Sequence, residues 1–579
     1  MPDAPAIDKE FDYLVPAKFA GVVVVGTRVR INLHGRRVGG WVTAVGSLIP
    51  AGFELKPLAG LSGMGPPKEI VDLAEWAAWR WAGRRAHFLA TASPVRVVRE
   101  APERRGSLTL PETSAAVRAV QSTGAFSGSP TVVRLPPAAD TVDWAHAAGL
   151  AGLGQGGAIV VVPGLARAAW LGRQLRSRGL PVALYPDEWA LAAAGEVVVV
   201  GTRTAAWAPL ARVGAGLVVD SHDEGLREER SPTWEAAVVL AERCRRDGGT
   251  AVRLSPCPTL EDLEWGRLVT LDRAEEHAGW ATVEVVDRRE GDPRDGLLTS
   301  RVVAAVRSGR RVACVINRKG HAGLLVCAAC EAIAVCEVCA GSVSQTSDGQ
   351  LTCRRCGVQR PPICAACASL KLKGLRPGTS RLSEHLAALV GSPVPELSAG
   401  PNRTAPDPIG PSAAEAQVVV GTEAALHRAG RRDTVIFLDF DQELLAPRLR
   451  AAEQAMALLA RASRLVRGRK GRVVVQTRQP DHPVLQAASQ ADPGLMVDSE
   501  RATRRELALP PYSAVAEVSG AGAEEFVGGI ADVVAVARSA DEPARWLVRA
   551  TSHEMLCDAL QAAPRPPGRL RVEVDPRRI

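Results

Sequence analysis

Lysine is scarce in this sequence: only eight of its 579 residues are lysines, and none lies between positions 69 and 318. None of the eight is followed by serine or threonine. This excludes the usual phosphate-binding P-loop, in which a lysine contacts the β- and γ-phosphates and the next hydroxyl binds Mg²⁺. Long apolar runs are absent as well, since none reaches the roughly eighteen residues that a membrane helix requires. We therefore expect a cytoplasmic protein with no membrane contact.

Length and charge indicate the architecture and the class of partner. A chain of 579 residues is too long for one hydrophobic core, so about three to five domains are expected. The hydrophobic content of 46% is typical of a globular protein. The net charge of +8 and the isoelectric point near 9.0 favour an anionic partner, of which nucleic acid is the usual one.

Eight of the twelve cysteines form four CxxC pairs within about forty residues: Cys327/Cys330, Cys336/Cys339, Cys353/Cys356 and Cys364/Cys367. Each pair can supply two thiolates from one tight turn, and two pairs complete a tetrahedral four-thiolate zinc site. Because such a site leaves no open position for a substrate, we expect two structural zinc ions. A disulfide framework is the alternative, but the chain is large and CxxC doublets are typical of zinc ligands. The spacing alone does not decide which pairs share an ion.

The N-terminal part predicts a small β unit followed by a helix. Residues 11–13, 26–31 and 39–42 predict short strands separated by glycine. Residues 70–90 predict an amphipathic helix with three tryptophans, which at this spacing belong more often to a core than to a base-stacking surface. The polar stretch 101–130 contains Ser, Gly and Pro and predicts a linker.

From about residue 131, short apolar runs alternate with helical segments, which predicts parallel sheets covered on both faces. The eight expected strands are 158–163, 197–202, 216–220, 251–255, 312–317, 418–422, 435–439 and 473–477. Their number indicates two α/β lobes. The cysteine pairs fall between the runs at 312 and 418, so they form an insertion in the second lobe. Further runs near 514–518 and 570–574 predict a separate C-terminal domain.

Short segments along the chain form a collinear series: FDYLVP at 11–16, VVVVGTRTAAWAPL at 197–210, VVD at 218–220, SPCPTLE at 255–261, INRKGH at 316–321, the eight cysteines, VVVGTEAAL at 418–426, LDFD at 438–441, VVVQTRQPDHPVL at 473–485 and ELALPPYS at 506–513. No single segment is decisive. Together they resemble the PriA family of bacterial replication-restart proteins, also called primosomal protein N-prime. Members of this family are superfamily 2 DNA helicases with a cysteine-rich insertion.

The resemblance implies an α/β multidomain fold. Its expected parts are an N-terminal small β domain that binds DNA 3′ ends (1–92), a linker (93–130), two RecA-like helicase lobes (131–275 and 276–498), a double-zinc Cys-rich insertion in the second lobe (325–370) and a small C-terminal α+β domain (499–579). The nested pairing of the family implies one zinc on the outer pairs (Cys327, Cys330, Cys364, Cys367) and one on the inner pairs (Cys336, Cys339, Cys353, Cys356).

In the family the N-terminal domain binds the 3′ end of a DNA strand. The matching positions are Phe11, Asp12, Tyr13, Gly35 and Lys56. An aromatic ring offers a base a stacking surface worth about 1–3 kcal/mol, and a lysine can bind a phosphate. Asp12 could accept a hydrogen bond from a terminal 3′-hydroxyl. Alternatively, one of the two aromatic side chains packs into the core of the small domain.

The chain departs from the family where nucleotide would bind. VVRLPPAAD at 132–140 stands in place of the glycine-rich loop, and its two prolines lack the amide donors that phosphates need. The family's Asp-Glu-Glu-His becomes DSHD at 220–223. This change keeps Asp220 as a Mg²⁺ ligand but loses the glutamate that orients the attacking water.

Two further nucleotide motifs are altered. The arginine-finger motif of the family is only partly matched near 461–468, although Arg464 and Arg467 keep its three-residue spacing. In the second lobe, GLRPGTS at 374–380 stands in place of the family's Gly-x-Gly-Thr-Glu. We therefore predict degenerate helicase lobes with no catalytic residue and no use of ATP or Mg²⁺.

Three functions remain open on this basis. The first is replication restart: binding of stalled or abandoned forks with a 3′ end at the junction and reassembly of the primosome, without helicase activity. The second is an active ATP-dependent 3′→5′ DNA helicase, in which an arginine such as Arg134 replaces the lysine. The third is a zinc-containing DNA-binding scaffold outside restart. The resemblance implies as partners forked DNA, single-stranded-DNA-binding protein and the proteins that load the replicative helicase.

Overall fold

Two parallel β-sheets form separate cores in this chain, and each belongs to its own compact unit. Unit 1 contains Met1–Val133, Asp140–Val269 and Ala502–Pro576, and unit 2 contains Arg134–Ala139, Thr270–Arg501 and Arg577–Ile579. The computed structural model describes every residue except 5–6, 47–54, 103–109, 290–295, 317–324, 331, 339–342, 347–348, 354–356, 375–378, 398–412, 414, 532–534, 539–544 and 578–579. Within the described residues, no helix is long and apolar enough to span a bilayer.

The N-terminal sheet of unit 1 has three antiparallel strands in the order β2-β1-β3: β1 (Arg28–Leu33), β2 (Arg36–Trp41) and β3 (Gly60–Gly63). β1 alternates buried and exposed residues, as expected for a strand with one face on a core. The predicted strand at 11–13 is wrong, because in this segment only Leu14 forms a β-bridge, to Pro57. The 3₁₀ helix η1 (Ala17–Phe19) follows.

Two helices, α1 (Lys68–Arg80) and α2 (Arg85–Ala92), follow the N-terminal sheet. Trp81 is buried and makes an edge contact with Trp76 at 5.5 Å between ring centroids. The Nε1 atom of Trp79 donates to Asp558 Oδ1 at 2.7 Å. The predicted core role of the tryptophan cluster is therefore confirmed for Trp81.

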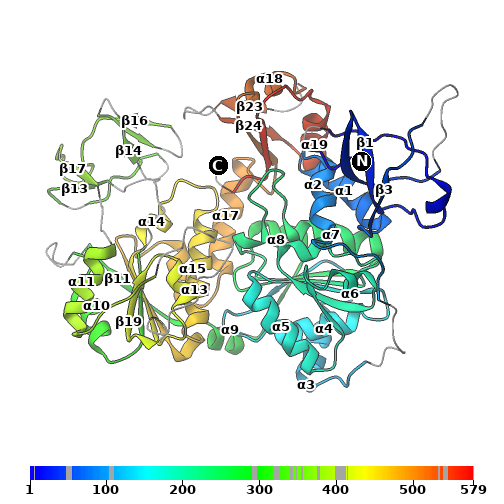
Figure 1. The fold of residues 1–579 in the computed structure, drawn as a ribbon. Helices are drawn as coiled ribbons and strands as arrows, with labels where there is room; N and C mark the ends of the chain where they lie inside the picture. Colours follow the sequence, from blue (N-terminus) through cyan, green and yellow to red (C-terminus); the bar gives the residue numbers. More distant parts are fainter. Residues whose placement is uncertain are drawn as a thin grey trace. The chain divides into compact units, whose positions relative to one another are not determined.

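The first lobe contains a seven-stranded sheet in the order β10-β4-β9-β8-β5-β7-β6. Helices cover both faces of this sheet (Figure 1), as expected for strands that are apolar throughout. The strands are β4 (Thr131–Arg134), β5 (Gly157–Val161), β6 (Val182–Tyr185), β7 (Val197–Gly201), β8 (Ala215–Val219), β9 (Thr250–Ser255) and β10 (Arg267–Thr270). The helices are α4 (Val142–Gly152), α5 (Leu165–Ser177), α6 (Trp189–Ala193), η2 (Arg203–Trp207), η3 (Glu224–Leu226), α7 (Ala236–Asp247) and α8 (Leu260–Trp265).

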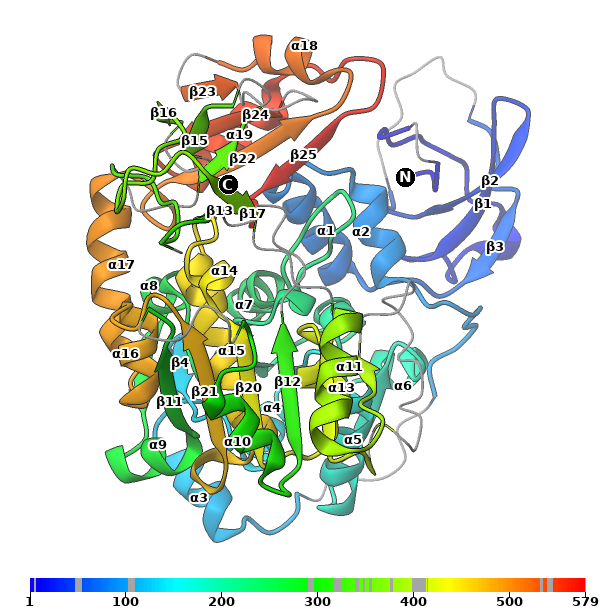
Figure 2. The same cartoon turned by 90° about the vertical axis from the view of Figure 1, so that its left-hand side faces the viewer.

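The second lobe contains a six-stranded sheet in the order β11-β21-β20-β12-β19-β18, and its first four strands lie side by side in Figure 2. The strands are β11 (Thr282–Asp287), β12 (Val312–Ile316), β18 (Glu396–Leu397), β19 (Val418–Gly421), β20 (Thr434–Asp439) and β21 (Arg472–Thr477). The helices are α9 (Arg273–Gly279), α10 (Ser300–Arg307), α11 (Thr379–Val390), α13 (Ala424–Arg428), α14 (Asp441–Leu444), α15 (Ala451–Leu465), η5 (Gly468–Lys470), α16 (Pro483–Ser489) and α17 (Gly494–Glu506).

All eight strands predicted for the two lobes are confirmed, and the cysteine-rich insertion leaves the second lobe after β12. In its described residues the insertion contains two small antiparallel sheets, and side chains from both sheets belong to one hydrophobic cluster. The first pairs β13 (Leu325–Cys327) with β17 (Leu372–Gly374), and the second has the order β14-β15-β16. The strands of the second are β14 (Val343–Gln345), β15 (Leu351–Cys353) and β16 (Gln359–Arg360).

The C-terminal domain is an α+β unit, as predicted. Its sheet has the order β23-β24-β22-β25, with β22 (Ala514–Ser519), β23 (Ala535–Arg538), β24 (Arg545–Ala550) and β25 (Arg571–Val574). The helices are α18 (Ala523–Gly528) and α19 (His553–Ala562). Buried residues of β22, β24, β25 and α19 belong to the same hydrophobic cluster as α1 and the first lobe.

The predicted linker 93–130 contains a helix that the sequence reading missed. This is α3 (Ala115–Ser122), whose N-terminus is capped by the Ser114 side chain, which accepts from the Val117 amide. Only Val117 and Val120 of the helix are buried. The apolar stripe is thus too short to be recognised among polar neighbours, and α3 depends on packing against α4.

Candidate functional site

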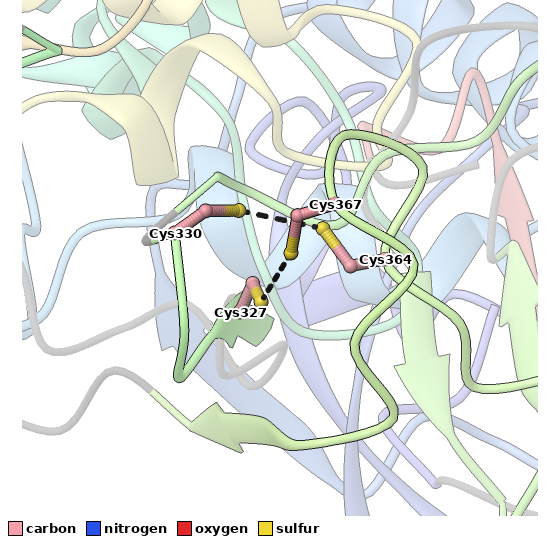
Figure 3. Close-up of side chains that lie close together, drawn as sticks. All are labelled: Cys327, Cys330, Cys364 and Cys367. Atoms are coloured by element: carbon pink, nitrogen blue, oxygen red, sulfur yellow. Dashed lines mark hydrogen bonds between the residues drawn. The ribbon is translucent and has the colours of Figure 1, made fainter.

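The two outer CxxC pairs converge in the inserted module. The Sγ atoms of Cys327, Cys330, Cys364 and Cys367 all lie within 4.8 Å of one another. Cys327 Sγ is 3.5 Å from Cys367 Sγ, and Cys330 Sγ is 3.6 Å from Cys364 Sγ (Figure 3). Tetrahedral zinc with Zn–S bonds of about 2.3 Å places its sulfur ligands about 3.8 Å apart. This group could therefore hold a metal ion, and its members are those of the nested pairing.

Tight turns after short strands present the four thiols. At the first pair, the Cys327 amide donates to Ala332 O at 2.9 Å. At the second pair, the Ala368 amide donates to Cys364 O and the Cys364 amide donates to Ser369 O, each at 2.9 Å. Each turn aims two sulfur atoms toward the same point, which is what the two-residue spacing of a CxxC pair provides.

The electrostatics of the cluster favour a cation at its centre. The backbone amides of Cys330 and Ala329 lower the pKa of Cys327 to about 6, since they stabilise its thiolate. At Cys367 the Ser369 amide also favours the thiolate, but the neighbouring Cys330 and Cys327 thiols raise its pKa to about 12. One thiolate therefore forms readily, while further thiolates beside it need a positive ion to offset their repulsion.

The two inner CxxC pairs are only half described. Cys336 and Cys353 are buried together in a small hydrophobic cluster with Val343 and Leu351. The Cys353 amide donates to Val358 O, and the Gly357 amide donates to Cys353 O, both at 2.9 Å. Cys339 and Cys356 lie outside the described residues. The second predicted zinc site therefore stays a prediction.

The predicted 3′-end residues come together from two segments of the N-terminal unit. Leu14 and Lys56 are joined by a backbone hydrogen bond of 3.0 Å from the Leu14 amide, and the Leu58 amide donates to Leu14 O at 3.0 Å. These bonds hold residues 11–13 beside Lys56, whose side chain is exposed. A segment with an exposed aromatic residue and an exposed lysine are therefore neighbours along the backbone. Aromatic and basic side chains together suit a nucleotide.

The two aromatic side chains of this segment differ in exposure. Phe11 is 39% exposed, whereas Tyr13 packs against the small core and its Oη donates to Asn32 O at 3.1 Å. Of the two aromatic residues, Tyr13 is thus the one that packs into the core of the small domain, which was the alternative expected for one of them. Gly35 forms the turn between β1 and β2 with φ +75°, and a Cβ atom there would meet no other atom within 4 Å. The constraint at Gly35 is therefore its left-handed backbone rather than crowding.

The segment in place of the glycine-rich loop is filled by internal contacts of unit 2. The Arg134 guanidinium binds both carboxylate oxygens of Glu276, with Nε–Oε1 2.6 Å and Nη2–Oε2 2.8 Å. Its Nη1 atom also donates to Asp492 Oδ1 at 2.9 Å. The side chains of Arg134 and Glu276 are only 15% and 4% exposed. The arginine considered as a substitute for the P-loop lysine is thus paired with two carboxylates.

The following residues of this segment are also packed. Pro136 and Pro137 are buried, and a Cβ atom added at Gly279 would lie 2.2 Å from Pro136 Cβ. The Ala138 amide donates to Gly279 O at 3.2 Å, and Arg464 Nε donates to Pro137 O at 2.8 Å. Arg464, expected to be an arginine-finger remnant, therefore bonds the backbone of the altered loop. Arg467 lies beyond the end of α15 with φ +65°.

Asp220 directly follows β8, has a left-handed conformation with φ +55° and is 4% exposed. The residues that follow it serve structural contacts. Ser221 Oγ donates to Asp262 Oδ2 at 2.8 Å, and His222 Nδ1 lies 2.9 Å from Ser255 Oγ. Neither side chain offers the carboxylate that would orient a water. The altered motif at 374–380 lies partly outside the described residues, at 375–378.

The sequence reading missed the partners of Arg134. Glu276 and Asp492 lie 142 and 358 positions away from it, in ordinary helical and loop contexts. No local sequence pattern predicts such ion pairs, because only the fold brings residues this far apart in the sequence together.

A family model described as the PriA 3′DNA-binding domain (3′BD) matches residues 2–94. The probable replication restart protein PriA of Mycobacterium tuberculosis is 29% identical over 580 residues, which cover 90% of this chain and 86% of the relative. The corresponding protein of Mycobacterium leprae is 29% identical over 94% of this chain and 89% of its own. The replication restart protein PriA of Bacillus subtilis is 26% identical over 62% of this chain and 49% of its own.

Among solved structures, Dbp5 of S. cerevisiae bound to RNA and ADP BeF3 aligns with a TM-score of 0.37 and 11% identity, covering 68% of this chain and 94% of that chain. The helicase MrfA bound to DNA and AMPPNP aligns with a TM-score of 0.35 and 12% identity, covering 67% of this chain and 53% of that chain.

Proposed function

We propose, from its relationship to the replication restart proteins PriA, that this chain binds stalled or abandoned replication forks at a 3′ end and helps reassemble the replication machinery without turning over ATP. The observation that carries this proposal is the exposed Phe11 ring next to Asp12, in a segment that is hydrogen-bonded through Leu14 to the backbone of Lys56 and that matches the 3′DNA-binding domain. Stacking, a hydroxyl acceptor and a phosphate partner are the contacts that a terminal nucleotide needs.

The contacts of residues 134–139 support the absence of ATP turnover. Phosphoryl transfer depends on amide donors, a lysine and Mg²⁺ placed around the phosphates. Here Arg134 is neutralised by Glu276 and Asp492, both prolines of the segment are buried, and Pro136 packs against Gly279 of α9. Binding a triphosphate there would require breaking a buried ion pair, which typically costs about 3–5 kcal/mol.

The active helicase remains the second candidate because of Asp220. This carboxylate stands at the carboxyl end of β8, where the strand order of an α/β sheet often places a Mg²⁺ ligand. One carboxylate without a phosphate-binding loop does not position a triphosphate, so we rank this function below fork binding.

We further propose that the insertion holds two zinc ions, one on the outer and one on the inner CxxC pairs. The outer thiols already have the separation that a tetrahedral ion requires. Closed four-thiolate sites would hold the small module folded and leave its surface for DNA and for protein partners. By the family resemblance these partners are single-stranded-DNA-binding protein and the proteins that load the replicative helicase.

The test of fork binding compares two DNA forks that differ only in the 3′ end at the junction, which carries a hydroxyl in one and a phosphate in the other. We expect the full-length protein to prefer the hydroxyl fork, and Asp12→Ala to remove this preference more than the overall affinity. Lys18→Ala is the matched control, because Lys18 is exposed on η1 in the same unit and lies outside the proposed pocket. Equal binding of both forks by the unsubstituted protein would contradict the proposal.

A further inference from the structure

Positive charge is concentrated in the N-terminal sheet and the segments around it. Residues 13–68 contain seven lysines and arginines and one acidic residue, Glu54, which lies outside the described residues. Seven positive charges and one negative charge give this stretch a net charge of +6, out of +8 for the whole chain. An anionic partner is therefore attracted to this sheet more than to the rest of the chain.

Two arginines lie on the outward face of this sheet. Along β1, Val29 and Ile31 are buried whereas Arg30 and Asn32 are exposed. Arg37 on β2 lies opposite Asn32, so it shares that outward face and is diagonal to Arg30, at about 7–8 Å between Cα atoms. Within the described part of the chain, neither arginine forms an ion pair with a carboxylate. Their charge is thus free for an external anion.

Glycines flank Arg30 on both neighbouring strands. Gly39 of β2 and Gly60 of β3 are its direct partners in the sheet. A Cβ atom added at Gly60 would lie 3.2 Å from Arg37 Nη2, because that guanidinium crosses the sheet to donate to Ala59 O at 3.2 Å. Neither direct partner of Arg30 thus carries a side chain of its own, and the Arg37 guanidinium lies over Gly60. The two guanidinium groups can therefore face one extended anionic chain that passes close to the backbone.

The acidic residue Asp3 borders the face of Arg30 and Arg37 at the edge of β2. Asp3 pairs with the edge of β2, since its amide donates to Gly39 O at 2.9 Å. A Cβ atom added at Gly39 would lie 3.9 Å from Asp3 Oδ2, so the carboxylate is on the same face as Arg30. The Asp3 carboxylate would repel phosphates at that edge of the sheet. Phosphates would therefore bind more favourably near Gly60, where the Arg37 guanidinium lies.

The basic face is directly connected to the proposed 3′-end pocket. The Ala59 amide donates to Arg30 O at 2.9 Å, and Gly60 follows Lys56 by four residues. Four extended residues span at most about 13 Å. At roughly 3.4 Å per nucleotide along one strand, this distance corresponds to about four nucleotides.

We propose that Arg30 and Arg37 bind the phosphates of the last few nucleotides before the 3′ end, and that the glycine-flanked surface between β2 and β3 guides this stretch of DNA. The inference rests on the proposed function, because it takes the terminal nucleotide to lie beside Phe11 and Lys56. It adds the direction in which the strand leaves that pocket, over the outer face of the sheet.

The test measures how fork affinity depends on salt for the full-length protein and for the double variant Arg30→Gln/Arg37→Gln. Each lost phosphate contact lowers the slope of log K against log salt by roughly 0.7–0.9, so we expect a decrease of about 1.5. Affinity near physiological salt should fall by about tenfold. The preference for a 3′-hydroxyl should persist, because the substituted side chains are outside the pocket. Arg173→Gln, on the exposed side of α5, should leave both quantities unchanged.

A second arm changes the DNA instead of the protein. Neutral methylphosphonate linkages in the last four nucleotides should weaken binding of the unsubstituted protein and have little further effect on the double variant. Asp3→Asn should raise affinity by about twofold, since it removes a nearby negative charge. An unchanged salt slope in the double variant, or an equal loss for both proteins on the neutral linkages, would overturn the inference. A 3′-hydroxyl preference retained beside either result would leave the proposed function standing.

Discussion

Arg134 and Glu276 form a bidentate ion pair, with Nε–Oε1 2.6 Å and Nη2–Oε2 2.8 Å, in the segment predicted to stand in place of a phosphate-binding loop. Both side chains are largely removed from solvent. A guanidinium held by a buried carboxylate is not available to a nucleotide phosphate. Residues 134–139 thus take part in the packing of unit 2, in which α9 supplies the carboxylate.

This ion pair should be important for stability. We expect Glu276→Gln to lower the free energy of unfolding by about 3 kcal/mol, because it leaves the largely buried Arg134 charge with Asp492 as its one remaining carboxylate partner among the ion pairs described above. Denaturant unfolding followed by circular dichroism measures the change. Glu275→Gln is the matched control, since Glu275 is the exposed neighbour on the same helix, and it should change stability by less than about 0.5 kcal/mol. Equal losses in the two variants would show that the pair is not a special contact.

The zinc proposal predicts close to two zinc ions per chain in protein purified without added metal. Cys330→Ser should reduce the content to about one, because it removes a ligand from the outer cluster alone. Cys257→Ser should keep both ions, since Cys257 is a buried residue of the first lobe. Elemental analysis decides the matter. A content near zero, or one that Cys330→Ser leaves unchanged, would contradict the proposal.

The sequence predicts those features that depend on local pattern. The eight apolar runs became strands because parallel strands are buried on both faces, so their composition alone marks them. The spacing of Cys327 and Cys330 likewise determines a tight turn. Contacts between distant segments were not predictable: no local pattern near Arg134 indicates Glu276 as its partner, and none near Leu14 indicates the bridge to Pro57.

A buried carboxylate near the C-terminus should make stability depend on pH. Burial disfavours the charge of Asp575, but Arg80 at 2.7 Å and His553 at 2.8 Å hold its pKa well below the usual range. A carboxyl group with a lowered pKa stabilises the fold above its unfolded value of about 3.9, and this contribution is lost as the pH falls further. Asp575 directly follows β25, and its carboxylate is paired with Arg80 of α1. Loss of its charge should therefore weaken the packing of the C-terminal domain.

We therefore expect Asp575→Asn to lower the free energy of unfolding by about 2–3 kcal/mol at pH 7. The difference from the unsubstituted protein should shrink below about pH 4, where the unfolded chain takes up the proton. Asp187→Asn, at an exposed turn, provides the control and should show little difference at either pH. A difference between the Asp575 variant and the unsubstituted protein that is constant from pH 7 to pH 3 would contradict the role of this charge.

The most direct test of the central claim is phosphate release from ATP and Mg²⁺ by the full-length protein while it is bound to a fork with a 3′-hydroxyl at the junction. The ion-paired Arg134, and an Asp220 that lacks the neighbouring glutamates expected from the family, predict no release above background and the same fork affinity with and without ATP. DNA-stimulated release that is abolished by Asp220→Ala would contradict the account and establish the chain as an ATP-dependent enzyme.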